Sequence, residues 1–327
     1  MFLARTAVSV GLALLLAACG KAAPDAAYLA SLKDAQQRLD ASRGEEALLD
    51  EADAALQRLI RDHPQLPQAY VHAARVAVRR GRLFGSRQDS AENLVRTALR
   101  LDPDDCSAHA VLGNVLLRRK DYSGALQELD DADRSDCPYV WRHVTRGRVL
   151  EALERFEQAQ AAYAKVSPGA DDDRGGKNAY VEAQLGLASV AMHRGDAQGV
   201  RTHALESLRQ AQDGDAWALG NAADWLWQAG DFDRAIDLAH QALQHRNYPA
   251  GRRILAHALY GKSLWLRSHA GDAASEAQAA ALEQEAAALD VESAKARAAL
   301  WGSLANRDPG FRELLQQRIA ADRSGNL

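Results

Sequence analysis

Residues that often carry chemistry occur in this chain without the partner residues that the chemistry requires. Ala256 and Gly261-Lys262-Ser263 together satisfy the loose pattern of a phosphate-binding loop. Such a loop lies between a buried strand and a helix, and its glycines turn backbone N–H groups toward the phosphates. Here the flanking residues, 254–259 and 264–267, continue a helical pattern. We therefore expect no nucleotide binding.

The ten histidines and the acidic runs show no metal-ligand spacing. His240 and His245 are five positions apart, which does not place them on one face of a helix. The run from Asp171 to Gly176 lacks the alternate spacing and terminal glutamate of a calcium loop, and is typical of a solvated linker. Neither a His-Glu-x-x-His nor a Gly-x-Ser-x-Gly motif is present. We expect no metal, no cofactor and no enzymatic activity.

The composition favours helices that pack closely through small side chains. Alanine and leucine are very frequent, 6% of the residues are aromatic, and no sustained alternation of Val, Ile and Thr indicates a sheet. The formal net charge is −4, so the chain has no strong general attraction to nucleic acid or anionic lipid.

Prolines interrupt the chain at a nearly regular interval. Pro64, Pro103, Pro138 and Pro168 are separated by 39, 35 and 30 residues. Short polar breaks divide the units between them into two apolar-periodic halves. The breaks are Arg80 to Leu83, Lys120 to Tyr122, Glu154 to Phe156, Gly195-Asp196 and Gly230 to Phe232. A period in the mid-thirties with helical halves predicts stacked helical hairpins.

The units resemble the tetratricopeptide repeat. That family has small residues at fixed positions of both helices, large residues between them and a terminal proline. The unit that starts at Cys106 matches it at Leu112-Gly113, Leu116, Tyr122, Ala125, Leu129, Ala132 and Pro138. The unit near Val140 matches it at Gly147, Leu150, Phe156, Ala159, Tyr163 and Pro168. The resemblance implies an all-α fold, a right-handed superhelical solenoid of about six hairpins with a helical C-terminal cap.

The first residues have the pattern of a secretory signal. Arg5 is followed by the apolar stretch Ala7 to Ala18, which as a helix spans about 18 Å and is too short for a bilayer core of roughly 30 Å. Leu16-Ala17-Ala18-Cys19 resembles the bacterial lipobox, which implies that Cys19 is lipidated and becomes the first mature residue. In that family rule Gly20 favours the outer membrane, with the protein facing the periplasm. The alternative is an ordinary secretory signal with a chance cysteine.

These patterns predict four segments. They are a signal peptide (1–18), a lipidated tether (19–25), the solenoid (26–271) and the helical cap (272–327). A long Ala/Glu-rich stretch begins at Asp272, and Asp308-Pro309 starts a last helix. A coiled-coil dimerisation segment is the alternative for the cap, although its leucines do not keep a heptad spacing.

Cys106 and Cys137 flank one predicted hairpin. Cys106 opens its first helix and Cys137 follows its second, so both lie at the same end of the hairpin. A disulfide there would add about 3–4 kcal/mol of stability. Two unconnected small residues remain the alternative, because the direction of the side chains is not set by the spacing.

The first helices line the concave groove in the family. Carried onto this chain, the groove positions are Arg75, Arg79, Asn114, Arg118, Trp141, Arg148, Glu151, Trp217, Asp224 and Trp227, with Glu182 and Met192 between them. Arginines and aromatic rings are common anchors at protein interfaces. Packing of the tryptophans between repeats and plain solvation of the arginines are the alternatives.

The resemblance implies a protein-binding scaffold in the cell envelope, active in envelope assembly or secretion, with an envelope protein or peptide as its partner and neither nucleic acid nor nucleotide. The alternative is a polysaccharide export or assembly factor that binds glycan or a synthase through the groove. In that case Trp141, Trp217 and Trp227 would be stacking platforms for sugar rings.

Overall fold

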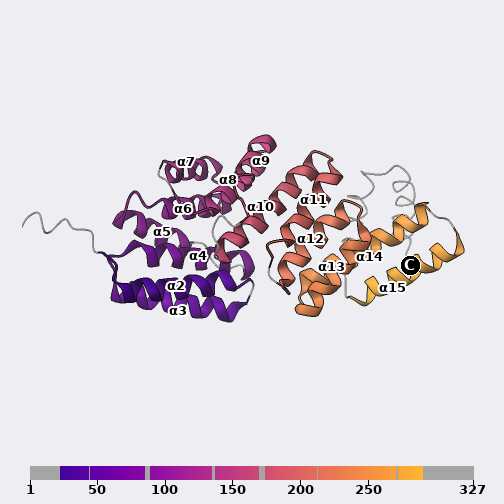
Figure 1. The fold of residues 1–327 in the computed structure, drawn as a ribbon, viewed down its shortest axis with the longest axis horizontal. Helices are drawn as coiled ribbons and strands as arrows, with labels where there is room; N and C mark the ends of the chain where they lie inside the picture. Colours follow the sequence, from indigo (N-terminus) through magenta and orange to yellow (C-terminus); the bar gives the residue numbers. More distant parts are fainter. Residues whose placement is uncertain are drawn as a thin grey trace, which may run out of the picture. The chain divides into compact units, whose positions relative to one another are not determined.

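The computed structural model describes residues 23–43, 45–84, 89–134, 137–168, 174–211, 213–269 and 272–289. Every regular element in these ranges is an α-helix, which confirms the all-α prediction (Figure 1). The expected signal peptide, Cys19 and the predicted helix after Pro309 lie outside the described residues. None of the described helices is both long enough and apolar enough to cross a membrane.

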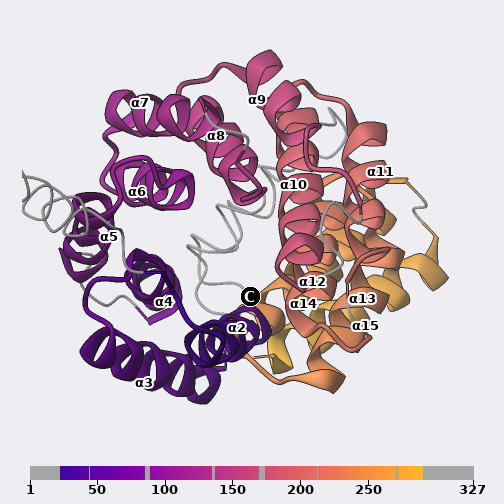
Figure 2. The ribbon, with the colours of Figure 1, turned by 60° about the vertical axis from the view of Figure 1, so that its left-hand side comes forward.

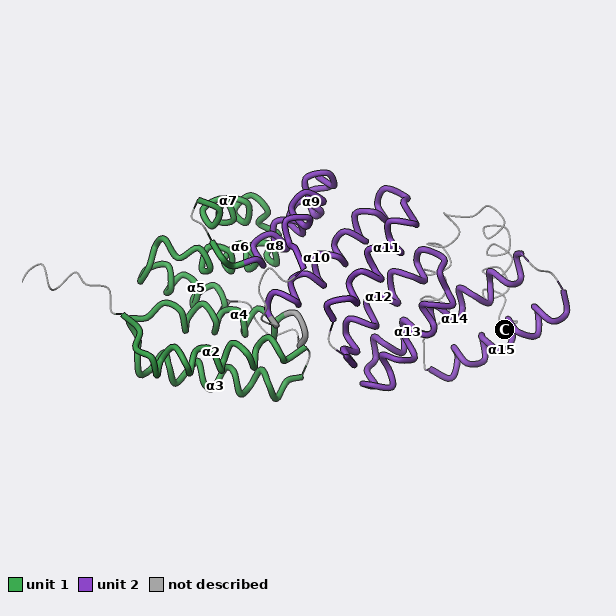
Figure 3. The backbone as a smooth tube through the Cα atoms, in the orientation of Figure 1, with its two compact units in different colours: residues 1–139 green, residues 140–327 purple. Residues whose placement is uncertain are grey.

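The chain divides into two compact units, residues 1–139 (unit 1) and 140–327 (unit 2), coloured separately in Figure 3. The division falls within the segment 26–271 that the sequence presents as one solenoid. Each unit has its own hydrophobic core and is described by itself.

Unit 1 contains three helical hairpins. In chain order their helices are α2 (Ala26–Ala41) and α3 (Glu46–Asp62), α4 (Pro67–Phe84) and α5 (Asp89–Leu101), and α6 (Cys106–Arg118) and α7 (Tyr122–Asp133). The first helices α2, α4 and α6 contact one another in succession, and each second helix contacts the next first helix (Figure 2). The core includes Tyr28, Leu39, Leu49, Leu56 and Val76. This is the stacking expected of tetratricopeptide-like repeats.

Unit 2 contains four hairpins stacked in the same way. Their helices are α8 (Trp141–Ala152) and α9 (Phe156–Tyr163), α10 (Arg174–His193) and α11 (Ala197–Leu208), α12 (Ala216–Gln228) and α13 (Phe232–His245), and α14 (Pro249–His269) and α15 (Ala273–Ala288). The sequence pattern placed the residues of α15 in the cap. In the structure α15 packs on α14 as the second helix of a hairpin, with Arg267 donating to Glu276 at 2.9 Å and also pairing with Glu283.

Four of the five predicted polar breaks are turns within the hairpins. The fifth, Arg80 to Leu83, was placed wrongly, because α4 continues as a helix through these residues to Phe84. Lys120, Glu154, Gly195 and Gly230 occupy equivalent places in the four turns and have φ between 57° and 77°. This left-handed conformation ends the first helix. Asp121 and Asp196 then cap the second helices by accepting from the backbone N–H of Gly124 at 2.9 Å and of Gly199 at 2.8 Å.

Candidate functional site

In unit 1, two of the three predicted groove arginines, Arg75 and Arg79, make contacts between successive first helices. Arg75 on α4 donates to Asp40 on α2 at 2.9 Å, and the two side chains are 10% and 3% exposed. The Arg75 guanidinium also lies 5.4 Å from the centre of the Tyr139 ring. Arg79 donates to the carbonyl of Leu39 at 2.8 Å, at the C-terminal end of α2. Both arginines therefore help α2 and α4 to stack.

Burial and this positive charge set the titration of the neighbouring groups. Burial, and to a lesser extent the charge of Arg75, whose Nη1 lies 2.8 Å from Nδ1 of His72, together lower the pKa of His72 to about 3. Burial also raises the pKa of the Tyr139 phenol. His72 is therefore neutral at physiological pH.

On α6, the predicted groove residues Asn114 and Arg118 are half-buried and one helical turn apart.

In unit 2, the same kind of pair joins α8 to α10. Arg148 on α8 forms a salt bridge with Glu182 on α10, and their side chains are 29% and 10% exposed. Glu151, one turn further on, accepts from the hydroxyl of Tyr163. Burial raises the pKa of Tyr163 well above its ordinary value, and the charge of Glu151 raises it further. Trp141 donates its indole N–H to the carbonyl of Gly175 at 3.2 Å.

The predicted tryptophans differ in exposure. Trp227 is 6% exposed and belongs to the core of unit 2, where its Nε1–H donates to Asp224 at 2.9 Å and its ring meets His257 edge-on at 5.4 Å. The structure therefore places Trp227 in the core, not on a surface, because a large indole fills the space between α12 and α14. Burial raises the pKa of Asp224, against the lowering effect of the Trp227 hydrogen bond. Trp217 is half-buried and packs against Val181 and Leu185.

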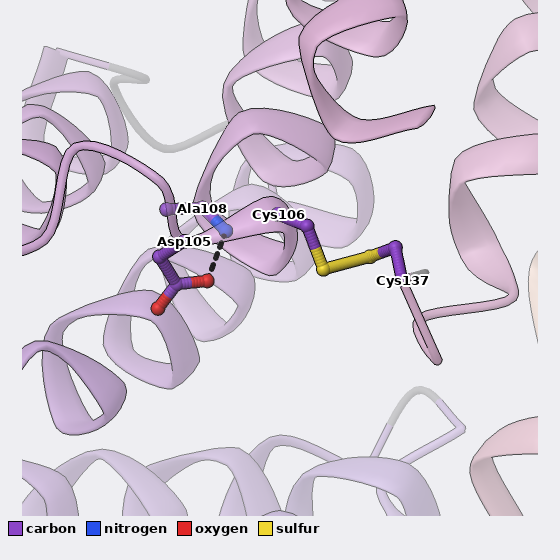
Figure 4. Close-up of a disulfide and its surroundings, with 4 residues drawn as sticks. All are labelled: Asp105, Cys106, Ala108 and Cys137. Carbon is purple, nitrogen blue, oxygen red and sulfur yellow. Dashed lines mark hydrogen bonds between the residues drawn. A yellow bond between two sulfur atoms is a disulfide. The ribbon is translucent and has the colours of Figure 1, made fainter. Parts of the chain in front are cut away.

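Cys106 and Cys137 form a disulfide in the structure (Figure 4). Their Cα atoms are 5.8 Å apart, and the bridge joins the first residue of α6 to the segment after α7. Beside it, Asp105 caps α6 by accepting from the backbone N–H of Ala108 at 3.0 Å. The bridge closes the third hairpin of unit 1 at the end where α6 begins and α7 ends.

A cluster on the same hairpin was missed by the sequence analysis. His109 on α6 lies 2.7 Å from Glu128 on α7, and Asp131 is close to both. The hydrogen bond to Glu128 raises the pKa of His109, whereas its burial lowers it. The spacing of residues along the chain did not indicate this cluster, because its three side chains come from two different helices. The only available cue was that Glu128 and Asp131 share one face of α7, the helix predicted to pack on the helix of His109.

No protein-family model and no curated protein sequence matches the chain. Solved structures do match its fold. PilF of Pseudomonas aeruginosa has a TM-score of 0.50 and 17% identity, and the match covers 77% of this chain and 97% of PilF. The Cut9–Hcn1 hetero-tetramer of the APC/C gives a TM-score of 0.54 at 15% identity, over 81% of this chain and 48% of that one.

The human IFIT1 dimer with PPP-AAAA is a further structural match. Its TM-score is 0.51 at 13% identity, and the match covers 85% of this chain and 65% of the IFIT1 chain. Identities this low show a shared fold and carry no partner or activity with them. Together with the stacked hairpins, these structural matches establish the helical-repeat fold of the tetratricopeptide type.

Proposed function

We propose that this chain is a non-catalytic scaffold that binds an envelope protein or peptide and is held in the envelope by a lipid on Cys19. The observation that supports the scaffold is the stacking of helical hairpins within each unit, three described in unit 1 and four in unit 2, in a fold shared with PilF. Stacked repeats present an extended surface on which many side chains can meet one partner. The first-helix positions are the part of that surface to which the tetratricopeptide resemblance assigns binding.

The lipid anchor rests on the sequence Leu16-Ala17-Ala18-Cys19. Metabolic labelling with an alkyne fatty acid in a Gram-negative host tests it, and Cys19→Ser is the matched variant. We expect the parent chain to be labelled and to sediment with outer membranes, and the variant to be unlabelled and released by washing. Labelling that persists in the variant, or an unlabelled parent, would refute the anchor and leave the scaffold proposal standing.

The binding surface is best tested without breaking the ion pairs between first helices. Alanine at Arg75 or Arg148 would break the ion pairs that stack α2 on α4 and α8 on α10, and so would confuse folding with binding. A photo-crosslinking residue placed at Asn114 in unit 1, or at Trp217 in unit 2, keeps those pairs. Both positions are half-buried and lie on first helices.

Exposed second-helix positions provide the controls. Gln127 on α7 and Asp237 on α13 lie in the same hairpins as Asn114 and Trp217. We expect one envelope protein to crosslink at Asn114 or Trp217 and not at the controls, and the purified partner to bind the parent chain more weakly at high salt. Equal capture at first-helix and control positions would reject the first-helix surface as the site.

The glycan alternative is not favoured by the described residues. Trp227, one of its three stacking platforms, is a core side chain with its N–H bonded to Asp224. Trp141 also uses its N–H internally. A change in tryptophan fluorescence on adding soluble glycan, absent from a Trp217→Leu variant, would revive it.

A further inference from the structure

The strongest unexplained cluster lies on the third hairpin of unit 1 and contains none of the predicted groove residues. His109 on α6 and Glu128 and Asp131 on α7 each offer one ligand atom, and these atoms all lie within 4.8 Å of one another. Glu128 and Asp131 are three residues apart and so face the same side of α7. Their side chains are 22% and 21% exposed, and that of His109 is 17% exposed.

The hydrogen bonds orient the imidazole of His109. Its Nε2 lies 2.9 Å from the backbone carbonyl of Pro103, and its Nδ1 lies 2.7 Å from Oε2 of Glu128. A carbonyl oxygen can only accept, so Nε2 carries a proton and Nδ1 faces the carboxylates. Histidines that bind metals have this arrangement, in which the second ring nitrogen donates to a carbonyl or carboxylate.

The charge around the imidazole is negative. Asp131 and Glu128 lie beside it, and Asp105, which caps α6, precedes it by one turn. A nearby cation, Arg134, lies with Nη1 2.6 Å from Oδ1 of Asp131, but its side chain is 77% exposed. Rotation of a side chain this exposed into solvent costs little, because such surface pairs contribute little free energy.

We infer that Nδ1 of His109 and the carboxylates of Glu128 and Asp131 form a binding site for Zn²⁺ that ties α6 to α7. One imidazole and two carboxylates suit zinc better than Mg²⁺ or Ca²⁺, which take oxygen ligands alone. Ligand atoms of a tetrahedral zinc ion lie about 3.3 Å apart, so side-chain rotations suffice to adopt that geometry. Three protein ligands leave the fourth position to water. Any proton on Nδ1 is released when the metal binds.

The test is a zinc titration of the full chain, purified without a polyhistidine tag, stripped with chelator and kept oxidised at pH 8. We expect one equivalent of Zn²⁺ to bind by isothermal calorimetry with release of protons. We also expect Zn²⁺ to raise the melting temperature, while Mg²⁺ and Ca²⁺ at the same concentration do not. A parent chain that binds no stoichiometric zinc overturns the inference and leaves His109 and Glu128 as a hydrogen-bonded pair.

Three variants assign the site. Asp131→Asn keeps the His109–Glu128 contact and the shape of the side chain, and should weaken zinc binding at least ~100-fold without changing the metal-free melting temperature. Arg134→Gln removes the competing cation and should tighten binding by about threefold to tenfold at low salt. His240→Gln is the control. Nε2 of His240 lies 3.1 Å from Oε1 of Glu285 in an exposed pair, and among the described residues this pair has no third metal-ligating side chain beside it.

These variants distinguish the cluster from adventitious zinc binding elsewhere in the chain. If Asp131→Asn binds zinc as the parent does, or if His240→Gln loses the bound equivalent, the assignment is wrong. Loss in Asp131→Asn, gain in Arg134→Gln and no change in His240→Gln together support it. The readouts are a heat of binding and a melting temperature, so they do not depend on the proposed scaffold function.

Discussion

Arg75 and Arg148 occupy the same position in their repeats, and both face a carboxylate on a neighbouring first helix. The partners are Asp40, 35 residues before Arg75, and Glu182, 34 residues after Arg148. The sequence identified the arginines as groove residues but not their partners, because the stacking of one repeat on the next brings distant positions together. The charges of Arg75 and Arg148 therefore already take part in contacts between repeats, whether or not a partner is bound.

The Arg75–Asp40 pair gives the first stability prediction. Arg75→Met leaves a carboxylate that is 3% exposed without this guanidinium, so we expect a loss of about 3 kcal/mol in the free energy of unfolding. The double variant Arg75→Met with Asp40→Leu should lose less than the sum of the two single changes, by at least ~1 kcal/mol. Urea denaturation measures each value.

An exposed pair in the same unit supplies the control. Arg38 contacts Glu51 with both side chains 40% or more exposed, so Arg38→Met should cost clearly less than Arg75→Met. If Arg75→Met costs no more than Arg38→Met, burial of the Arg75–Asp40 pair does not matter to stability.

His257 gives a prediction for pH. Burial, and to a lesser extent the charge of Arg253, together lower its pKa to about 4. Between the ordinary value of 6.5 and about 4, the unfolded chain binds a proton at His257 that the folded chain does not. The stability contributed by neutral His257 is therefore lost as the pH falls through this window. We expect the parent to lose stability relative to His257→Gln between pH 7 and pH 4.5, measured by urea denaturation at each pH. A difference that stays constant with pH would contradict the assignment.

At the scale of the helices, the sequence predicted the hairpins well and their contacts poorly. The breaks at Lys120 to Tyr122 and at Gly195-Asp196 are the observed turns, because left-handed residues and aspartate caps are local signals. The position of α15 was not predicted, since its packing on α14 depends on Arg267 and Glu283, which lie on different helices. The Trp227 ring was likewise assigned to a groove, although the tertiary packing places it in the core.

Tyr163 shows why glycines occur inside helices of this fold. Its ring, 1% exposed, contacts Gly147 on α8 and Gly186 on α10, and a Cβ added at either would lie 2.4 Å from a ring atom. We expect Gly147→Ala to destabilise the chain by about 1–2 kcal/mol, because overpacking against the ring exceeds the gain in helix propensity. Thermal and urea unfolding measure the loss. In a Tyr163→Leu background the same substitution should cost clearly less, and an equal cost in both backgrounds would show that the ring is not the obstacle.

At the scale of the whole chain, each unit has a core of its own, around Tyr28 and Leu49 in unit 1 and around Leu226 and Leu259 in unit 2. We therefore expect fragments 23–139 and 140–327 each to fold, with helical circular dichroism and cooperative unfolding, since repeats draw their stability from adjacent repeats. The cysteines provide an internal control. Reduction should lower the stability of fragment 23–139 by about 3–4 kcal/mol, through loss of the Cys106–Cys137 bridge, and leave fragment 140–327, which has no cysteine, unchanged. A fragment that stays unfolded would show that its core is not sufficient alone, and an equal response of both to reductant would exclude the bridge as the cause.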